Sequence, residues 1–567
     1  MSRPNKRRKS SAEALQVILA AVSDYESSDD DEIDSSSGSD GIVEEIDEDD
    51  DAENADTSGD DSGEENEGWS NVENDYIPQI FDFTGDSGIK ANITSDNKPP
   101  EIYKLFLTDE LLALIVNETN RYAAQFLASH TVKPQSRAKA WKETDAAEIK
   151  KLIGLVFLMG VVRKPTVESY WSGNALLATP IFQRTMSRDR FTLLLKFLHF
   201  SNSETAPQDD RLYKLREICD IIRRRIQEVY IPDKEISIDE SMVLWRGRLM
   251  FRQYIPGKKH KYGVKLYELC DPNGYVWNAS VYCGKEDRAA GVGHSETVVK
   301  DLIGPLLDKG YHLYVDNFYT GIPLAKDLME HNTHVCGTLR RNRKFLPKDV
   351  VTAKLTKGQV VKKRSGQITV LKWKDKRDVL MLSTMHSGHV VQSNKLNRKR
   401  ELIQKPNCIL DYNKYMCGVD RSDQLASYYD PLRKTLKWYR KVVFHFMDIA
   451  LCNSYVLYKK LGGKKKQIWF RMQVIQDLIH GSTATADLDE EPSNIHPKYH
   501  HKASDETRLV GKHSLEHIPP TGKKQHPTKP CVICRKRGLR KESRYCCKTC
   551  ISKPALCIDP CFGAFHK

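Results

Sequence analysis

Four aspartates stand at spacings that could build a site for divalent cations. Asp239 lies in the segment SIDESMV, Asp316 follows the apolar run YHLYV, and Asp420 and Asp423 lie three residues apart in GVDRSDQ. Side chains three apart share one face of a helix, so Asp420 and Asp423 could act together. Carboxylate oxygens suit Mg²⁺, and two such ions can activate a water or a 3′-hydroxyl for phosphodiester chemistry. The alternative is that these aspartates are ordinary solvated charges in a chain with 76 acidic residues.

The segments around the first two aspartates have the pattern of strands. In EISIDESMV, Ile236 and Ile238 alternate with Ser237 and Asp239, which predicts a half-buried strand. YGVKLYELCD and GYVWNASVYC predict two more strands, joined by a tight turn in DPNG. A helix over 296–307 then leads to the short apolar strand that ends at Asp316, and HVCGTL predicts a fifth strand. We therefore expect a mixed α/β sheet that carries these two carboxylates.

Helices are expected on both sides of this sheet in the sequence. FTLLLKFLHF and LREICDIIRRRIQEVY have apolar residues at helical spacing, so 101–230 is predicted to be mainly helical. The apolar run LIGLVFLMGVV has eleven residues, too few to cross a bilayer, and predicts a buried helix in a chain with no membrane partner. QITVLKW and VLMLSTM predict a small β module within 347–405, and helical character returns at 414–460.

The charge of the chain is distributed very unevenly. Residues 1–100 hold 28 acidic and 7 basic residues, a net charge of −21, whereas the whole chain of 567 residues carries +12. The remainder must therefore carry +33, which favours a polyanionic partner such as nucleic acid. The acidic segment has little to bury and is expected to be disordered. The basic run KRRK that precedes it, Lys6 to Lys9, is compatible with nuclear import.

Two basic segments close to the aspartates predict contacts with DNA. Lysine and arginine side chains neutralise phosphates, and an aromatic ring beside them can stack on an unpaired base. The segment after Asp239 contributes Arg246, Arg248, Lys258 and Lys259, and the segment after Asp420 contributes Arg433, Lys434 and Trp438. The alternative for the tryptophan is an ordinary place in the core.

The cysteine-rich end of the chain has the spacing of a zinc module. Two CxxC pairs are followed by two more cysteines and a histidine, and no secretory signal points to disulfides. The seven expected ligands are Cys531, Cys534, Cys547, Cys550, Cys557, Cys561 and His566. Two structural zinc ions would need eight ligands, and Cys546 and His513 remain as alternatives for the eighth.

Three blocks of the sequence together resemble the piggyBac family of DNA transposases. These blocks are SIDESMVLWRGRLMFRQYIPGKKHKYGVKLYELCD, YVDNFYTGIPLAKDL and YNKYMCGVDRSDQLASYYDPLRKTLKW. The resemblance implies an RNase H-like α/β core with a β-rich insertion, a discontinuous helical DNA-binding and dimerisation domain, and a zinc-binding domain at the C-terminus. It also implies that Asp239, Asp316 and Asp420, accompanied by Asp423, hold two Mg²⁺ ions, for which Mn²⁺ could substitute.

The same resemblance implies a function and partners. It predicts a nuclear homodimer that nicks transposon terminal inverted repeats, forms and reopens hairpins, and joins the ends to TTAA target DNA. The alternative is a domesticated, non-catalytic DNA-binding or chromatin-associated protein that retains the fold. The expected boundaries are a disordered region over 1–100, the helical domain over 101–235 and 431–505, the core over 236–346 and 408–430, the insertion over 347–407, a linker over 506–525 and the zinc domain over 526–567.

Overall fold

The computed structural model contains two compact units. The first falls within residues 1–488 and the second within 489–567. The described residues are 68–207, 209–256, 258, 261–284, 293–396, 400, 402–431, 435, 437–481, 513–522, 524–550 and 552–566.

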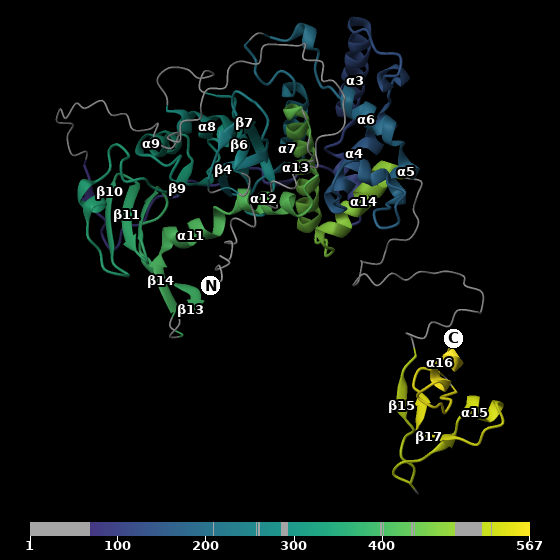
Figure 1. Cartoon of the computed structure of the whole chain (residues 1–567). Helices are drawn as coiled ribbons and strands as arrows, with labels where there is room; N and C mark the ends of the chain where they lie inside the picture. The colour runs from purple at the N-terminus through teal and green to yellow at the C-terminus, as the bar shows by residue number, and fades with distance from the viewer. Residues whose placement is uncertain are drawn as a thin grey trace, which may run out of the picture. The chain divides into compact units, whose positions relative to one another are not determined.

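A mixed β-sheet forms the centre of the first unit (Figure 1). Its strands run in the order β1 (Ser70–Asn71), β10 (Val360–Ser365), β11 (Ile368–Lys374), β12 (Asp378–Ser383), β9, β8, β4, β6 and β5, and β7 also pairs with β6. β4 pairs antiparallel with β6 and parallel with β8, and β8 in turn pairs parallel with β9. The core strands are β4 (Glu235–Leu244), β5 (Gln253–Tyr254), β6 (Tyr262–Cys270), β7 (Val276–Val281), β8 (His312–Val315) and β9 (His334–Thr338). All five predicted strands of the RNase H-like core are therefore confirmed.

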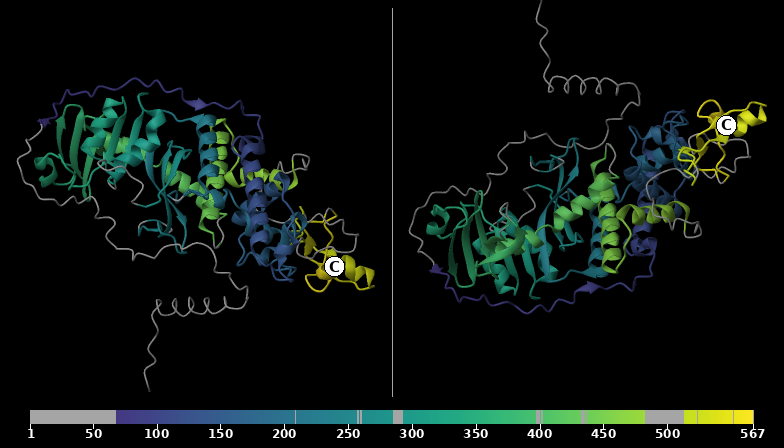
Figure 2. Two further views of the ribbon diagram at one scale, coloured as in Figure 1. Left: turned by 90° about the horizontal axis from the view of Figure 1, so that it is seen from above. Right: turned by 90° about the horizontal axis from the view of Figure 1, so that it is seen from below.

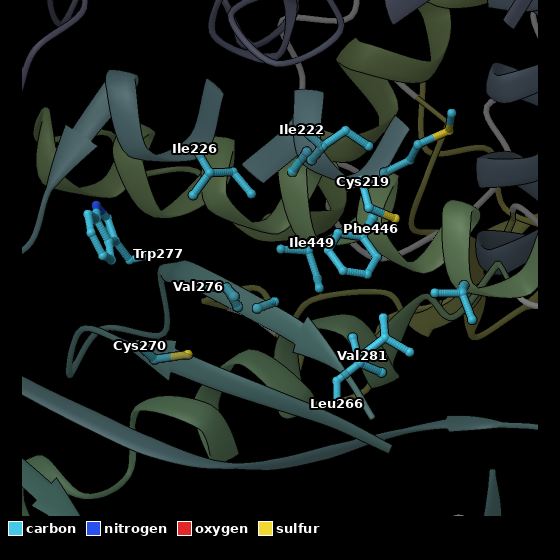
Figure 3. Packing of buried hydrophobic residues seen from close by; sticks show 14 of the residues in the cluster. Cys219, Ile222, Ile226, Leu266, Cys270, Val276, Trp277, Val281, Phe446 and Ile449 are labelled. Carbon is cyan, nitrogen blue, oxygen red and sulfur yellow. The ribbon is translucent and has the colours of Figure 1, made fainter. Parts of the chain in front are cut away.

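Two helices cover one face of this sheet. Helix α7 (Arg216–Val229) and helix α13 (Trp438–Lys460) lie far apart in the sequence, yet both pack over β6 and β7 (Figure 3). Ile222 from α7, Ile449 from α13 and Val276 from β7 belong to the same buried cluster. Because each fully buried aliphatic side chain contributes roughly 1.5–3 kcal/mol, this cluster fixes the helical segments against the core.

The helical part of the first unit contains the helices that the sequence predicts. The run LIGLVFLMGVV lies in α4, where residues 152–160 are all buried. Asp145 caps the start of α4 by accepting a hydrogen bond from the Glu148 N–H. The remaining helices are α2 (Pro99–Lys104), α3 (Asp109–Ser129), α4 (Ala146–Val161), α5 (Pro180–Thr185), α6 (Arg188–Phe197) and α14 (Gln467–His480). Within the described part of the chain, no helix combines the length and apolar composition needed to cross a membrane.

The β-rich segment after the core extends the central sheet. Strand β12 pairs antiparallel with β9, and β11 and β10 continue the order outward. The elements of this segment are α10 (Lys348–Thr352), β10 (Val360–Ser365), β11 (Ile368–Lys374), β12 (Asp378–Ser383), β13 (Val390–Leu396) and β14 (Leu402–Pro406). Helices α8 (His294–Ile303), α9 (Ile322–Glu330), α11 (Asn407–Tyr415) and α12 (Gly418–Tyr428) complete the first unit. The predicted boundaries between insertion and core stay a prediction, since the two share one hydrogen-bonded sheet.

Residues 68–98 form an ordered strap, so the expected disordered region of 1–100 extends too far. Strand β1 (Ser70–Asn71) pairs with β10, and β2 (Gly88–Ile89) pairs with β3 (Tyr230–Ile231) beside the helices. Figure 2 shows this purple segment along the outside of the sheet. Between the two strands, Phe81 stacks on His334 with ring centroids 4.5 Å apart, and Phe83 meets Tyr311 edge to face at 5.0 Å.

Removing the strap is expected to destabilise the first unit, whereas removing the residues before it is not. A chain that lacks 1–67 should melt like the full chain, and a chain that lacks 1–90 should melt several degrees lower. The reason is that the half-buried Phe81 and Phe83 lose their ring contacts and part of a burial that is worth roughly 1.5–3 kcal/mol when it is complete. Scanning fluorimetry on the three chains measures the effect, and equal melting temperatures for all three would show that the strap contributes nothing.

The second unit is a small module with short strands and helices, whose start lies earlier than expected (Figure 1). Its elements are β15 (Leu515–His517), β16 (Lys529–Pro530), α15 (Val532–Lys536), β17 (Glu542–Ser543), β18 (Tyr545–Cys547) and α16 (Cys561–His566). Strand β15 pairs with β18, so the segment predicted as a linker over 506–525 already belongs to the module. The predicted helical segment of 431–505 contains α13 and α14, and its part after residue 481 lies outside the described residues.

Candidate active site

The first two candidate aspartates lie next to each other because β4 and β8 are parallel neighbours. In their register Ile238 pairs with Val315, so the following residues on the two chains are Asp239 and Asp316. β8 ends at Val315, and Asp316 begins the turn after it. The Asp316 carboxylate accepts a hydrogen bond of 2.9 Å from the Phe318 N–H, which fixes its direction. Two residues 77 positions apart are thereby brought to one edge of the sheet.

A third carboxylate, which the sequence pattern did not single out, joins this pair. One carboxylate oxygen from each of Asp239, Glu240 and Asp316 lies within 4.8 Å of the other two. The Glu240 side chain also accepts a hydrogen bond of 3.0 Å from the Tyr319 hydroxyl and lies 3.4 Å from the Lys265 ammonium. Lys265 therefore neutralises part of the charge of this group, hereafter the carboxylate cluster, which consists of these three acids.

Helix α12 carries Asp420 and Asp423, and its first residue, Gly418, packs closely against the core. A Cβ atom at Gly418 would lie 2.5 Å from the Ser237 hydroxyl and 2.7 Å from the Asp271 carbonyl, so only glycine fits without displacement. Arg421 donates a hydrogen bond to the Pro272 carbonyl in the turn after β6. As a result the helix start is held close to β4, with Asp420 in the first helical turn and exposed and Asp423 half-buried.

Burial and mutual proximity raise the pKa of several of these carboxyls. Burial, opposed by the Lys258 ammonium, raises the pKa of Asp239 to about 8, and the charges of Glu240 and Asp316 contribute to the rise. Burial and then Glu240 raise the pKa of Asp316. Burial and then Glu268 raise the pKa of Asp423 to about 7. Carboxyl groups whose pKa is raised by burial and by neighbouring negative charges fit a site for divalent cations, because a bound cation would relieve the repulsion between the carboxylates.

Lys258 is placed differently from the simple phosphate contact expected from the sequence. Its ammonium donates a hydrogen bond to the Glu240 carbonyl. The carboxylates of Asp239, Asp423 and Asp420 all raise its pKa, although burial opposes them. The lysine thus links the acids on the strands to those on helix α12 by its positive charge.

The raised pKa values of Asp239 and Asp423 predict how the stability of the metal-free protein depends on pH. Asp239 and Asp423 have folded-state pKa values near 8 and 7, well above an unfolded value near 4, so the folded chain binds more protons between these limits. Stability from these groups is therefore full below about pH 4 and is lost as pH rises towards about pH 8. Millimolar Mg²⁺ should raise the melting temperature near pH 8 and have little effect near pH 5, because protons compete with the metal.

Melting curves at both pH values, with and without Mg²⁺, measure this response. The double variant Asp239→Asn/Asp423→Asn is the control, and it should lose the Mg²⁺ effect and most of the pH slope, with Asp316 supplying the remainder. An identical Mg²⁺ response in the double variant would mean that the cation binds elsewhere.

The remaining predicted DNA contacts divide into three groups. Arg246 and Arg248 are exposed after β4, where they remain free to meet a phosphate. Trp438 is the first residue of α13 and is half-buried, with its ring packed edge to face on Phe251 at 5.2 Å between centroids. Lys259, Arg433 and Lys434 lie outside the described residues. The role of each in DNA binding stays a prediction.

The second unit gathers its cysteines and histidines into two sets of four. Each set offers four ligand atoms within 4.8 Å of one another. One set consists of Cys531, Cys534, Cys557 and Cys561, and the other of His513, Cys547, Cys550 and His566. All seven predicted ligands are included, and the eighth position is filled by His513. The other alternative, Cys546, has its sulfur 4.0 Å from the Glu516 carboxylate instead.

The distances within the two sets suit tetrahedral zinc. Sulfur atoms are 3.5 Å apart between Cys534 and Cys561 and 3.9 Å apart between Cys534 and Cys557. Tetrahedral bonds of about 2.3 Å to zinc would place them about 3.8 Å apart. The His566 Nδ1 lies 2.9 Å from the Phe562 carbonyl, which directs Nε2 to within 3.4 Å of the Cys550 sulfur. The ligands of the two sets alternate along the chain, an interleaved arrangement that ties both ends of the module together.

The sheet has the RNase H-like strand order and carries Asp239 within β4 and Asp316 directly after β8, and the following helix α12 carries Asp420 and Asp423. Together with the two-site cysteine–histidine module, this arrangement is that of a DNA transposase. Comparison with known proteins agrees with this class. A family model described as "Transposase IS4" matches residues 98–455. A second, described as "DDE_Tnp_1-like zinc finger", matches residues 512–567. The chain belongs to this transposase family and is piggyBac-like, and its second unit is a structural zinc module.

Several named relatives and one solved structure are similar to the chain. The human PiggyBac transposable element-derived protein 3 is 28% identical over 392 residues, which cover 66% of this chain and 64% of that protein. The human PiggyBac transposable element-derived protein 2 is 25% identical over 409 residues, 68% of this chain and 66% of that protein. The chain thus spans just under two thirds of both.

The solved structure is described as a cryo-EM structure of the piggyBac transposase synaptic complex with hairpin DNA. Its chain matches with a TM-score of 0.60 and 25% identity, over 81% of this chain and 98% of that one. The expected fold is therefore confirmed, including its RNase H-like core.

Sequence reasoning missed two acids of the site. Glu240 directly follows Asp239, and strand alternation assigns it to the opposite face, yet its carboxylate reaches the cluster. Glu268 lies in YELCD, where β6 pairs with β4. The cue available for Glu268 was an acid between apolar residues near the end of a central strand, which is costly unless the acid is used.

Proposed function

We propose that this chain is an active DNA transposase that works as a homodimer in the nucleus. It binds the double-stranded terminal inverted repeats of a transposon, nicks them, forms and reopens hairpins, and joins the ends to TTAA target DNA. The observation that carries this proposal is the meeting of Asp239, within β4, and Asp316, directly after the neighbouring β8, beside the helix with Asp420 and Asp423. The similarity to a transposase described in complex with hairpin DNA supports the same reaction class.

The residues present fit a pair of Mg²⁺ or Mn²⁺ ions. Asp239 and Asp316 would hold them from the strands, and Asp420 with Asp423 from helix α12. Divalent cations bound there would lower the pKa of the attacking water or hydroxyl and stabilise the leaving oxygen of the phosphodiester. Lys265, 3.4 Å from the Glu240 carboxylate, offsets part of the negative charge of the carboxylate cluster.

Binding of DNA is assigned to groups outside the carboxylate cluster. Arg246 and Arg248 are exposed beside the end of β4 and would neutralise phosphates next to the cut site. The zinc module adds a separate basic surface, with Arg535, Lys536, Arg537, Arg540 and Lys541 exposed. We assign recognition of the transposon end to this module and non-specific affinity to the arginines of the first unit.

The second candidate is a non-catalytic, domesticated DNA-binding protein with the same fold. The names of the two human relatives, which call them transposable element-derived, favour it. Both candidates predict binding to transposon-end DNA, and only the first predicts a cut. Retention of all four aspartates favours the active enzyme, because a pure binding protein has no need for clustered acids beside DNA phosphates.

A cleavage assay on defined ends separates the two. The full chain, loaded with zinc, is incubated with labelled DNA that carries the terminal repeats flanked by TTAA, with Mg²⁺ or with a chelator. An active transposase gives nicks and hairpins that need the metal. Binding of the ends without any metal-dependent product would establish the second candidate.

A further inference from the structure

Glu268 is a buried acid close to the candidate site that the proposed function does not yet use. It lies on β6, directly opposite Asp239 on β4, and cross-strand partners in an antiparallel pair face the same side of the sheet. Its side chain is 1% exposed, so it is closed to bulk solvent and to DNA. The position is therefore adjacent to the metal-binding aspartates yet closed to substrate.

The hydrogen bonds of Glu268 leave half of its carboxylate without a partner. The Ser241 hydroxyl donates to Oε1 at 2.5 Å, and the His445 Nε2 on helix α13 lies 4.0 Å from the same oxygen, too far for a hydrogen bond. The other oxygen, Oε2, has no hydrogen-bond partner among the described residues. Within those residues, no lysine or arginine forms an ion pair with it. A buried carboxylate that has one oxygen without a partner and only the distant His445 as a counter-charge is costly, so its presence beside the site calls for a use.

Glu268 lies beside both halves of the candidate metal site. Its cross-strand partner is Asp239 on β4, and helix α12, which carries Asp423, packs against β6, the strand that carries Glu268. On the other side, burial alone would lower the pKa of His445, but Glu268 raises it above its ordinary value.

We propose that Glu268 is a positioning residue for the metal site, whose buried carboxylate supplies a fixed negative charge next to Asp239 and Asp423 and strengthens cation binding there. It acts through those two aspartates and touches neither DNA nor the scissile phosphate. This inference rests on the proposed function in one respect, that the aspartates bind divalent cations. The competing role is purely structural: the acid would serve only to attach helix α13 to β6 through His445.

Three variants distinguish these roles through Mn²⁺ affinity, measured by calorimetry on the zinc-loaded full chain without DNA. Glu268→Gln keeps the shape and loses the charge, and it should bind Mn²⁺ about tenfold or more weakly, as is usual for groups that support metal ligands. Glu268→Asp keeps the charge and leaves a small void, and it should bind Mn²⁺ more tightly than the glutamine variant. Glu118→Gln is the matched control, since Glu118 is also buried, at 6% exposed, with an unpartnered Oε2 but lies on α3. Its affinity should equal that of the wild type.

The outcomes separate the inference from the function on which it rests. A structural role predicts the reverse order, with glutamine tolerated and aspartate defective, and that order would overturn the inference. If Glu268→Gln failed to fold while Glu268→Asp folded, the inference would also be overturned, because the charge would then be needed only as the partner of His445. A wild-type chain whose Mn²⁺ binding is unchanged by Asp316→Asn would instead remove the metal site itself, and with it the proposed function.

Discussion

Asp316→Asn is expected to abolish cleavage of transposon ends while leaving their binding intact. Asparagine keeps the size of the side chain and the hydrogen bond from the Phe318 N–H, but it removes the charge that a cation needs. Loss of a metal contributes several kcal/mol to the barrier, and each 1.36 kcal/mol is a factor of ten, so nicking should fall about 1000-fold or more. DNA affinity should stay the same or rise slightly, because a negative charge beside the phosphates is lost.

The assay follows nicked product on denaturing gels, and a mobility shift on the same labelled end measures binding. Asp239→Asn and Asp420→Asn should match Asp316→Asn if all three residues are ligands. The control is Asp301→Asn, an exposed aspartate on α8, which should cleave at the wild-type rate. Near-normal nicking by any one of the three would remove that residue from the site.

Cys534→Ser is expected to unfold the zinc module alone and to remove recognition of the transposon end. The Cys534 sulfur lies within 3.9 Å of two other ligand sulfurs, and a serine hydroxyl is a poor replacement for a thiolate on zinc. Zinc content should fall from two ions to about one or fewer per chain, because metal binding supplies most of the folding free energy of such modules. The first unit has its own large core and should keep its melting temperature.

The control for this variant is a neighbouring cysteine outside both ligand sets. Cys546→Ser should keep two zinc ions and normal end binding, since Cys546 belongs to neither cluster. Binding is measured on end DNA and on scrambled DNA at two salt concentrations. Cys534→Ser should lose the preference for the end and retain the salt-sensitive affinity for any DNA. Equal losses on both DNAs would show that the module contributes charge without specificity.

The parts of the site that the sequence predicted are those fixed by local pattern. Alternation around Ile236 and Ile238 locates β4, and the apolar run before Asp316 locates the end of β8, so both aspartates could be placed on strands. Their proximity followed only from the family resemblance, because no local pattern reveals that β4 and β8 are parallel neighbours. The two CxxC pairs likewise predicted zinc from spacing alone.

The parts that were missed depend on contacts between distant segments. The strap over 68–98 continues an acidic region with little to bury, and its partners, such as β10 for β1 and His334 for Phe81, lie more than 200 residues away. Lys258 stands in a basic run typical of phosphate contacts, yet the fold turns its ammonium towards Glu240. His513 was named only as one of two alternatives for the eighth ligand, because it lies 34 residues before the Cys547 that it accompanies, beyond the spacing of the recognisable motif.

The junction between β9 and β12 has a consequence for how this protein tolerates truncation. Because β12 pairs with the outer edge of β9, the inserted segment over 347–407 also protects that edge of the core sheet. A chain trimmed of this segment would expose the unpaired N–H and C=O groups of β9, which form a template for strand addition from another molecule. Fragments that end at residue 346 are therefore prone to aggregate through their sheets, and fragments that retain β10 to β12 keep a native sheet edge.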